Sequence, residues 1–197
     1  MATADFILNL AIFTVTVLVT VFACFRKEGK WDVAYGKYRL RFFTMQSNIL
    51  CAVSALLMCI FPESTPVWLF KYVGTTAVTV TLLTVFLYLA PAIGKGGLYE
   101  LLKGRGFFVH LVTPLMALVS FCVFEKRGMT FGQALLGMLP LVYYGPLYLY
   151  KIRFAPEGKR WEDFYGFNRG GKWPLSMGAM LLGSFLVCLG LMALQNL

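Results

Sequence analysis

The sequence predicts an all-α polytopic membrane protein, a single domain formed by a bundle of six transmembrane helices. Hydrophobic residues make up 59% of the 197 residues, charged residues make up only 14%, and the mean hydropathy is +0.72. Ordinary soluble domains are about 45–50% apolar and about 25% charged, so a soluble core of this size could not bury so much apolar surface. The same composition excludes a disordered chain and a secreted disulfide scaffold.

Six apolar runs supply the predicted helices, since each has about the 20 residues that a spanning helix requires. The predicted spans are residues 6–25, 42–61, 67–90, 106–124, 131–150 and 174–194. Pro62 and Pro66 bracket a tight turn between the second and third spans, and Pro91 with the glycine-rich stretch of Gly94, Gly96 and Gly97 is expected to end the third. The first run is too long for a cleavable signal peptide and lacks a basic start, so we expect it to remain as a helix.

The distribution of basic residues predicts the orientation of the bundle. Of 18 lysines and arginines, three fall in or beside the second and fourth connections: Lys71, Lys126 and Arg127. The others lie in the first, third and fifth connections: Arg26, Lys27, Lys30, Lys37, Arg39, Arg41, Lys95, Lys103, Arg105, Lys151, Arg153, Lys159, Arg160, Arg169 and Lys172. The positive-inside rule places these three connections in the cytoplasm and both termini outside.

The net charge of +9 is explained by this topology and by contact with anionic lipid heads, so no nucleic-acid partner is expected. The five cysteines lie in apolar runs without the spacing of metal ligands, and we interpret them as small buried hydrophobic residues. Neither a metal ion nor an organic cofactor is expected. The cysteines are Cys24, Cys51, Cys59, Cys122 and Cys188.

The fifth connection, about residues 151–173, is the longest and interleaves aromatic residues with charges. Trp161, Phe164 and Tyr165 follow i, i+3, i+4 spacing, which predicts a short helix in the membrane interface. Such a segment serves either as an aromatic belt or as a lid over a cavity on the cytoplasmic side.

No charged residue is expected well inside a span, which argues against an ion channel, a proton pump or a carrier of charged substrates. The polar residues at the start of the second span are therefore informative. Four polar side chains in five positions are costly at the edge of a bilayer unless they are paired. They either cap the helix and bond to neighbouring helices, or form one wall of a polar site. They are Thr44, Gln46, Ser47 and Asn48.

His110, the single histidine, begins the fourth span and is the natural candidate for a general base. Thr44 and His110 lie at similar depths, about 5–8 Å inside the cytoplasmic boundary, so they can meet if the two helices pack together. A threonine hydroxyl requires an adjacent base to act as a nucleophile. A backbone carbonyl, Asn48 or a tyrosine would have to orient the imidazole, and a structural role for His110 remains the alternative.

The fifth span contains two prolines, Pro140 and Pro146, and several tyrosines near the same leaflet. Kinked helix packing accounts for this pattern. The alternative is that Tyr143 or Tyr144 donates a hydrogen bond into the region of Thr44 and His110.

Two short segments resemble the androgen-induced and androgen-dependent TFPI-regulating (ADTRP) family of six-helix membrane proteins, and look closer still to their bacterial relatives. The segments are Phe43-Thr44-Met-Gln-Ser-Asn48-Ile-Leu and His110-Leu-Val-Thr-Pro114-Leu. Members of this family are threonine hydrolases that cleave fatty acid esters of hydroxy fatty acids. The resemblance implies Thr44 as nucleophile, His110 as base, and a location in a bacterial plasma membrane.

These observations lead to the hypothesis of an intramembrane hydrolase of lipid esters, whose partner is a membrane lipid or an amphiphilic ester. Gln46, Ser47, Asn48, Tyr143 and Tyr144 are the candidates for contact with the substrate or the oxyanion. A lipid acyltransferase would use the same pair of residues. The competing class is a non-catalytic protein that binds a lipid or a protein partner, and the oligomeric state stays open.

Overall fold

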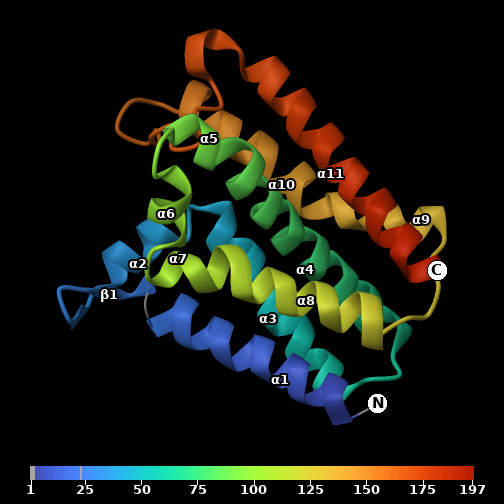
Figure 1. Ribbon diagram of the computed structural model, residues 1–197. Helices are drawn as coiled ribbons and strands as arrows, with labels where there is room; N and C mark the ends of the chain where they lie inside the picture. Colours follow the sequence, from blue (N-terminus) through green and yellow to red (C-terminus); the bar gives the residue numbers. More distant parts are fainter. Residues whose placement is uncertain (1–2, 23) are drawn as a thin grey trace.

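The chain forms a bundle of helices that run up and down between two ends, as expected for a polytopic membrane protein. The computed structural model describes residues 3–22 and 24–197, so residue 23 of the predicted first span lies outside the described residues. Both chain ends lie at one end of the bundle, and the short hairpin and the long fifth connection lie at the other (Figure 1). An even number of helical passages between the two ends gives this arrangement.

Five helical segments of the described chain are long and apolar enough to cross a membrane. They are Thr3–Phe22 (α1 and η1), Phe43–Ile60 (α3), Thr65–Ile93 (α4 Thr65–Thr84, η2 Val85–Leu89, α5 Ala90–Ile93), Arg105–Phe124 (α7 Arg105–Phe107, η3 Phe108–Val112, α8 Thr113–Val119, η4 Ser120–Phe124) and Trp173–Asn196 (α11). The predicted span 131–150 is a sixth, interrupted passage. It is built from α9 (Phe131–Leu135), η5 (Leu136–Met138), α10 (Leu139–Leu149) and η6 (Tyr150–Phe154).

Wide π-helical turns precede three of the prolines, because a proline cannot donate to the carbonyl four residues back. In η2, η3 and η6 the backbone N–H of the following residue reaches five residues back, for example from Thr113 to Phe108. The third helix therefore continues through Pro91 to Ile93 and ends at Gly94, whose φ of +89° suits a glycine. The expectation that Pro91 and the glycine-rich stretch end this helix is therefore correct for the glycines and wrong for Pro91, which the helix accommodates.

The connections at the loop end carry more structure than the sequence suggests. The first holds a two-stranded hairpin of β1 (Arg26–Lys27) and β2 (Lys30–Trp31), followed by α2 (Val33–Arg39), which Asp32 caps. The third holds α6 (Gly97–Leu102). The prediction of an interfacial helix at residues 161–165 is wrong, because this segment is irregular. The short helix found in the fifth connection is η7 (Arg169–Gly171).

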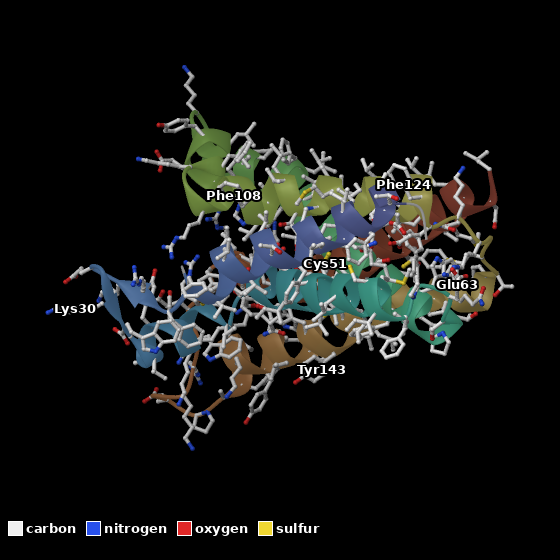
Figure 2. All side chains as sticks on the ribbon, turned by 90° about the horizontal axis from the view of Figure 1, so that it is seen from below. Lys30, Cys51, Glu63, Phe108, Phe124 and Tyr143 are labelled. Atoms are coloured by element: carbon white, nitrogen blue, oxygen red, sulfur yellow. The ribbon has the colours of Figure 1, made fainter. Side chains whose placement is uncertain are left out.

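Large apolar side chains cover the lateral surface of the bundle, while charged side chains gather at its two ends (Figure 2). Leu87, Val123 and Leu175, on three different helical passages, are 74%, 60% and 70% exposed. Aliphatic side chains that are exposed to this extent fit a hydrocarbon environment better than water.

A buried polar network joins α1, α4 and η4 near the end that holds the chain termini. The Lys71 amine is fully buried and donates to the Asn9 side-chain oxygen at 2.5 Å, and it lies 3.9 Å from a Glu125 carboxylate oxygen. The Asn9 amide donates to Asp5 at 3.0 Å and to Glu125 at 2.7 Å. The sequence predicts no charged residue well inside a span, and Asp5, Lys71 and Glu125 indeed lie near helix ends; their burial and mutual pairing were not expected.

This network predicts a large loss of stability when one partner is removed. Glu125→Ala leaves the Lys71 amine without its counter-charge, and breaking a buried ion pair costs about 3–5 kcal/mol. Thermal unfolding of the detergent-solubilised chain should show a clearly lowered midpoint. Lys126→Ala, at the exposed neighbouring position, is the matched control and should leave the midpoint unchanged. Equal midpoints for the two variants would contradict this account.

Candidate active site

Two cavities of different character meet at the start of α3. The larger, about 680 Å³, is almost entirely apolar, and the smaller, about 390 Å³, is lined by charged and polar groups as well. Thr44, Tyr88 and Tyr165 line both cavities. A molecule that is part apolar and part polar could therefore occupy both at once, with its middle at Thr44.

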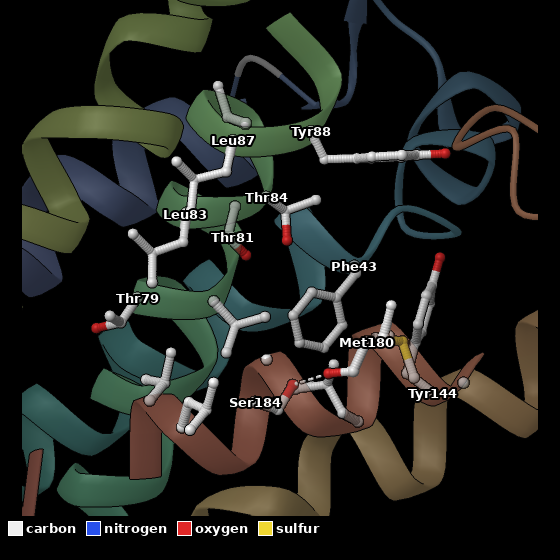
Figure 3. Close-up of a pocket in the computed structure, with 18 of the residues that line it drawn as sticks. Phe43, Thr79, Thr81, Leu83, Thr84, Leu87, Tyr88, Tyr144, Met180 and Ser184 are labelled. Atoms are coloured by element: carbon white, nitrogen blue, oxygen red, sulfur yellow. Dashed lines mark hydrogen bonds between the residues drawn. The ribbon is translucent and has the colours of Figure 1, made fainter. Parts of the chain in front are cut away.

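The apolar cavity lies between α4, α10 and α11, with Phe43 and Tyr144 at the end near Thr44 (Figure 3). It follows one face of α11 from Ser176 to Leu194, about 27 Å at 1.5 Å per residue. Leu87 and Leu186, on the two helices that border it, are 74% and 58% exposed. The cavity thus reaches the lateral surface, where lipid would lie.

His110 lines the polar cavity, and a main-chain carbonyl fixes its ring. The Nδ1 atom lies 2.7 Å from the Leu101 carbonyl oxygen. Since a carbonyl only accepts, Nδ1 carries the proton and the lone pair of the neutral ring is on Nε2. Gly106 permits this approach, because a Cβ at that position would collide with the Leu101 carbonyl. The sequence left the orienting group open, and a carbonyl from α6 fills that role.

Tyr165, from the fifth connection, lies at the start of α3 beside Thr44. Its hydroxyl accepts a hydrogen bond of 3.0 Å from the Phe43 backbone N–H, which α3 itself leaves unpaired. Tyr165 and Thr44 both line the apolar cavity and the polar cavity. Burial raises the pKa of Tyr165 above its usual value, so the group keeps its proton at neutral pH.

The three other polar residues of the α3 start make structural hydrogen bonds, and neither cavity is lined by them. Gln46 donates to the Leu40 carbonyl at 3.0 Å, and the Ser47 and Thr81 hydroxyls lie 2.9 Å apart. The Asn48 amide donates to the Thr44 carbonyl at 2.8 Å and to the Val109 carbonyl at 3.1 Å. These bonds hold α3 against α4 and η3.

The packing of α3 on η3 brings Thr44 and His110 to the same cavity. Asn48, one turn beyond Thr44, bonds to the residue that precedes His110. Within the described chain, no direct hydrogen bond joins the Thr44 hydroxyl to the imidazole. The two side chains border a common space instead, which a ligand would fill.

The two candidate tyrosines of the fifth span point in different directions. Tyr143 is 70% exposed and projects from the outer surface of the bundle (Figure 2), so it does not reach the site. Tyr144 is buried at the wall of the apolar cavity and donates to the Arg41 carbonyl at 2.8 Å. Tyr165 is the tyrosine that enters the region of Thr44. The sequence feature that could have pointed to it is the aromatic cluster of the fifth connection, to which it belongs.

Asp163 folds the fifth connection over the polar cavity. One carboxylate oxygen accepts from the Tyr148 hydroxyl at 3.0 Å and from the Phe167 N–H at 2.8 Å, and the other accepts from the Asn168 N–H at 2.8 Å. Phe164 then packs on Phe42, with ring centroids 4.3 Å apart. The fifth connection thus forms one wall of the polar cavity.

Comparisons of the chain with protein-family models, with curated proteins and with solved structures find no match in any of the three.

The hydrogen bonds to Asp163 predict a specific response to its loss. Asp163→Ala removes the acceptors of three hydrogen bonds, so the fifth connection should loosen while the helices stay packed. Limited trypsin digestion at Lys159 or Arg160 should become several times faster, with little change in the thermal midpoint. Glu162→Ala, an exposed neighbouring acid, should behave like the unaltered chain. Equal cleavage rates for both variants would contradict this role of Asp163.

Proposed function

We propose that this chain hydrolyses an ester of an amphiphilic lipid within the membrane, with Thr44 as the nucleophile and His110 as the base. The observation that carries the proposal is the position of Thr44, at the junction of an apolar cavity and a polar cavity that also holds His110. The resemblance of the segments around Thr44 and His110 to the ADTRP family of threonine hydrolases supports the same assignment.

The arrangement supports a two-step mechanism. The Thr44 oxygen attacks the ester carbonyl carbon while Nε2 of His110 takes the hydroxyl proton, and His110 then gives that proton to the departing alcohol. Water attacks the resulting acyl-threonine with His110 again as base, which releases the fatty acid and restores the threonine. The Leu101 carbonyl holds the imidazole in the required tautomer and stabilises the imidazolium formed in each step.

We assign Tyr165 as the donor to the oxyanion. The Tyr165 hydroxyl lies beside Thr44. The hydrogen bond that it accepts from the Phe43 N–H polarises the hydroxyl and makes it a better donor. The amides of Gln46 and Asn48 already donate to main-chain carbonyls, which argues against them in this role.

The proposed setting is a bacterial plasma membrane with both termini outside and the loop end in the cytoplasm. The basic residues of the three loop-end connections support this orientation. An amphiphile would enter sideways from the cytoplasmic leaflet between α4 and α11, where exposed leucines border the apolar cavity.

Substitution of the two central residues tests the mechanism. Thr44→Ala and His110→Ala should each reduce turnover of p-nitrophenyl esters, and labelling by a fluorophosphonate, by about a thousandfold. Thr44→Ser should keep part of the activity because it keeps a hydroxyl. Thr14→Ala, an exposed threonine on α1, is the control for loss of a threonine elsewhere.

Folding of each variant is checked by its thermal midpoint. Turnover that survives in folded Thr44→Ala would exclude this mechanism and favour a lipid-binding protein. Labelling of Thr44→Ala as strong as that of the unaltered chain would exclude Thr44 as the nucleophile.

The apolar cavity predicts a control of acyl-chain length by two glycines of α11. Gly183 and Gly190 line the cavity, and a Cβ at either meets no atom within 4 Å. Leucine at either position should fill part of the cavity and so limit the length of acyl chain that fits. Residue 183 lies about 10 Å nearer to Thr44 than residue 190 does, so Gly183→Leu should set a lower length limit than Gly190→Leu. Turnover of p-nitrophenyl esters of increasing length measures this.

Gly178→Leu is the matched control, since Gly178 has equal space but does not line the cavity. An identical length profile for all three variants would show that the acyl chain does not occupy this cavity.

A further inference from the structure

The polar cavity carries an excess of positive charge that the proposed hydrolysis does not require. Three arginines line it: Arg39 at the end of α2, Arg105 at the start of α7, and Arg169 in η7. Each comes from a different connection of the loop end. Asp163 is the one acidic residue in the described lining, so the fixed charge of the cavity is positive.

Asp163 accepts three hydrogen bonds, from Tyr148, Phe167 and Asn168, and these bonds shape the fifth connection. Its single negative charge offsets one of the three arginines, so the lining keeps a net positive charge toward a ligand.

Arg39 gives a second and independent indication of a ligand. Its Nε atom is buried and has no hydrogen-bond acceptor among the described residues. The guanidinium lies over the Phe42 ring, with its central carbon 5.2 Å from the ring centroid. A buried donor without an acceptor is costly, and the oxygens of a bound anion would satisfy it.

We propose that Arg39, Arg105 and Arg169 bind the phosphorylated head group of the amphiphile whose ester Thr44 attacks, an inference that rests on the proposed function. The acyl chain lies along α11 in the apolar cavity, the ester lies at Thr44, and the phosphate lies in the polar cavity. The substrate class is a fatty acyl ester of a phosphorylated alcohol, such as a monoacylglycerol phosphate.

A phosphate monoester fits this site better than the two other common head groups. It offers three terminal oxygens and up to two negative charges, which match several planar guanidinium forks. A carboxylate offers two oxygens and one charge, which one arginine can satisfy. A choline head group would place a cation among three guanidinium groups.

The test compares four esters of one fatty acid on the full chain in detergent micelles. They are the monoacylglycerol phosphate, the monoacylglycerol, the monoacylglycerol phosphocholine, and the acyl ester of a hydroxy carboxylic acid. We expect the phosphorylated ester to have the highest kcat/KM, at least tenfold above the neutral one. Arg39→Gln and Arg169→Gln should each reduce that ratio by about tenfold.

Arg153→Gln is the matched control, since Arg153 is an exposed arginine at the same end that does not line the cavity, and its ratio should stay unchanged. Binding is measured separately on Thr44→Ala, by the shift in thermal midpoint with each ester and with glycerol 3-phosphate. A shift with glycerol 3-phosphate alone would assign the site to free phosphates and overturn a lipid head group as its ligand.

The two hypotheses fail in different ways. Equal kcat/KM for the phosphorylated and neutral esters, or a preference for the carboxylate ester, would overturn the phosphate subsite and leave the hydrolysis standing. Arginine-dependent binding of the phosphorylated ester to Thr44→Ala, with no turnover by the unaltered chain, would keep the subsite and overturn the hydrolysis. Absence of both binding and turnover would overturn both.

Discussion

Within a bilayer every polar group has to find its partner inside the protein, because lipid offers none. The Lys71 amine is the most demanding case in this chain, since it is a fully buried charge. Asn9 accepts a hydrogen bond from this amine and Glu125 forms an ion pair with it, each from another helical passage. Asp5 and Ser120 complete the network. Trp68 adds a hydrogen bond of 2.8 Å to the Glu125 carbonyl. This network holds the helices together at the end that carries the termini, while the polar cavity lies toward the other end.

Prolines shape the opposite end through the wide turns that precede them. Tyr88 lies in η2 and His110 lies in η3, and both line the polar cavity. A π turn shifts the direction of the side chains that follow, and such turns are frequent at functional sites. In η3 this shift, together with the close approach that Gly106 permits, places the imidazole on the Leu101 carbonyl. The orientation of the candidate base thus follows from local backbone geometry.

The membrane-spanning helices could be predicted from the sequence because hydrophobic length is a local property. The third span, predicted to end at residue 90, ends at Ile93, and the others differ by similarly few residues. Long-range pairs could not be predicted. Glu125 lies 116 residues from Asn9, and Tyr165 lies 122 residues from Phe43, so no spacing rule links them. The helical spacing of Trp161, Phe164 and Tyr165 misled for a related reason, since tertiary contacts with Tyr148 and Phe42 fix that segment.

The contrast between the two cavities determines how a substrate can enter the site. A charged head group would lose its hydration in the apolar cavity and gain no partner there, whereas an acyl chain gains by leaving water. Only one orientation therefore satisfies both ends of an amphiphile, and it places the bond between them at Thr44. The first turn of α3 is held firmly, because Ser47 and Asn48 both bond to the Thr44 carbonyl. A β-branched side chain on a rigid helical turn has few rotamers, so the Thr44 hydroxyl is held at the junction of the two cavities.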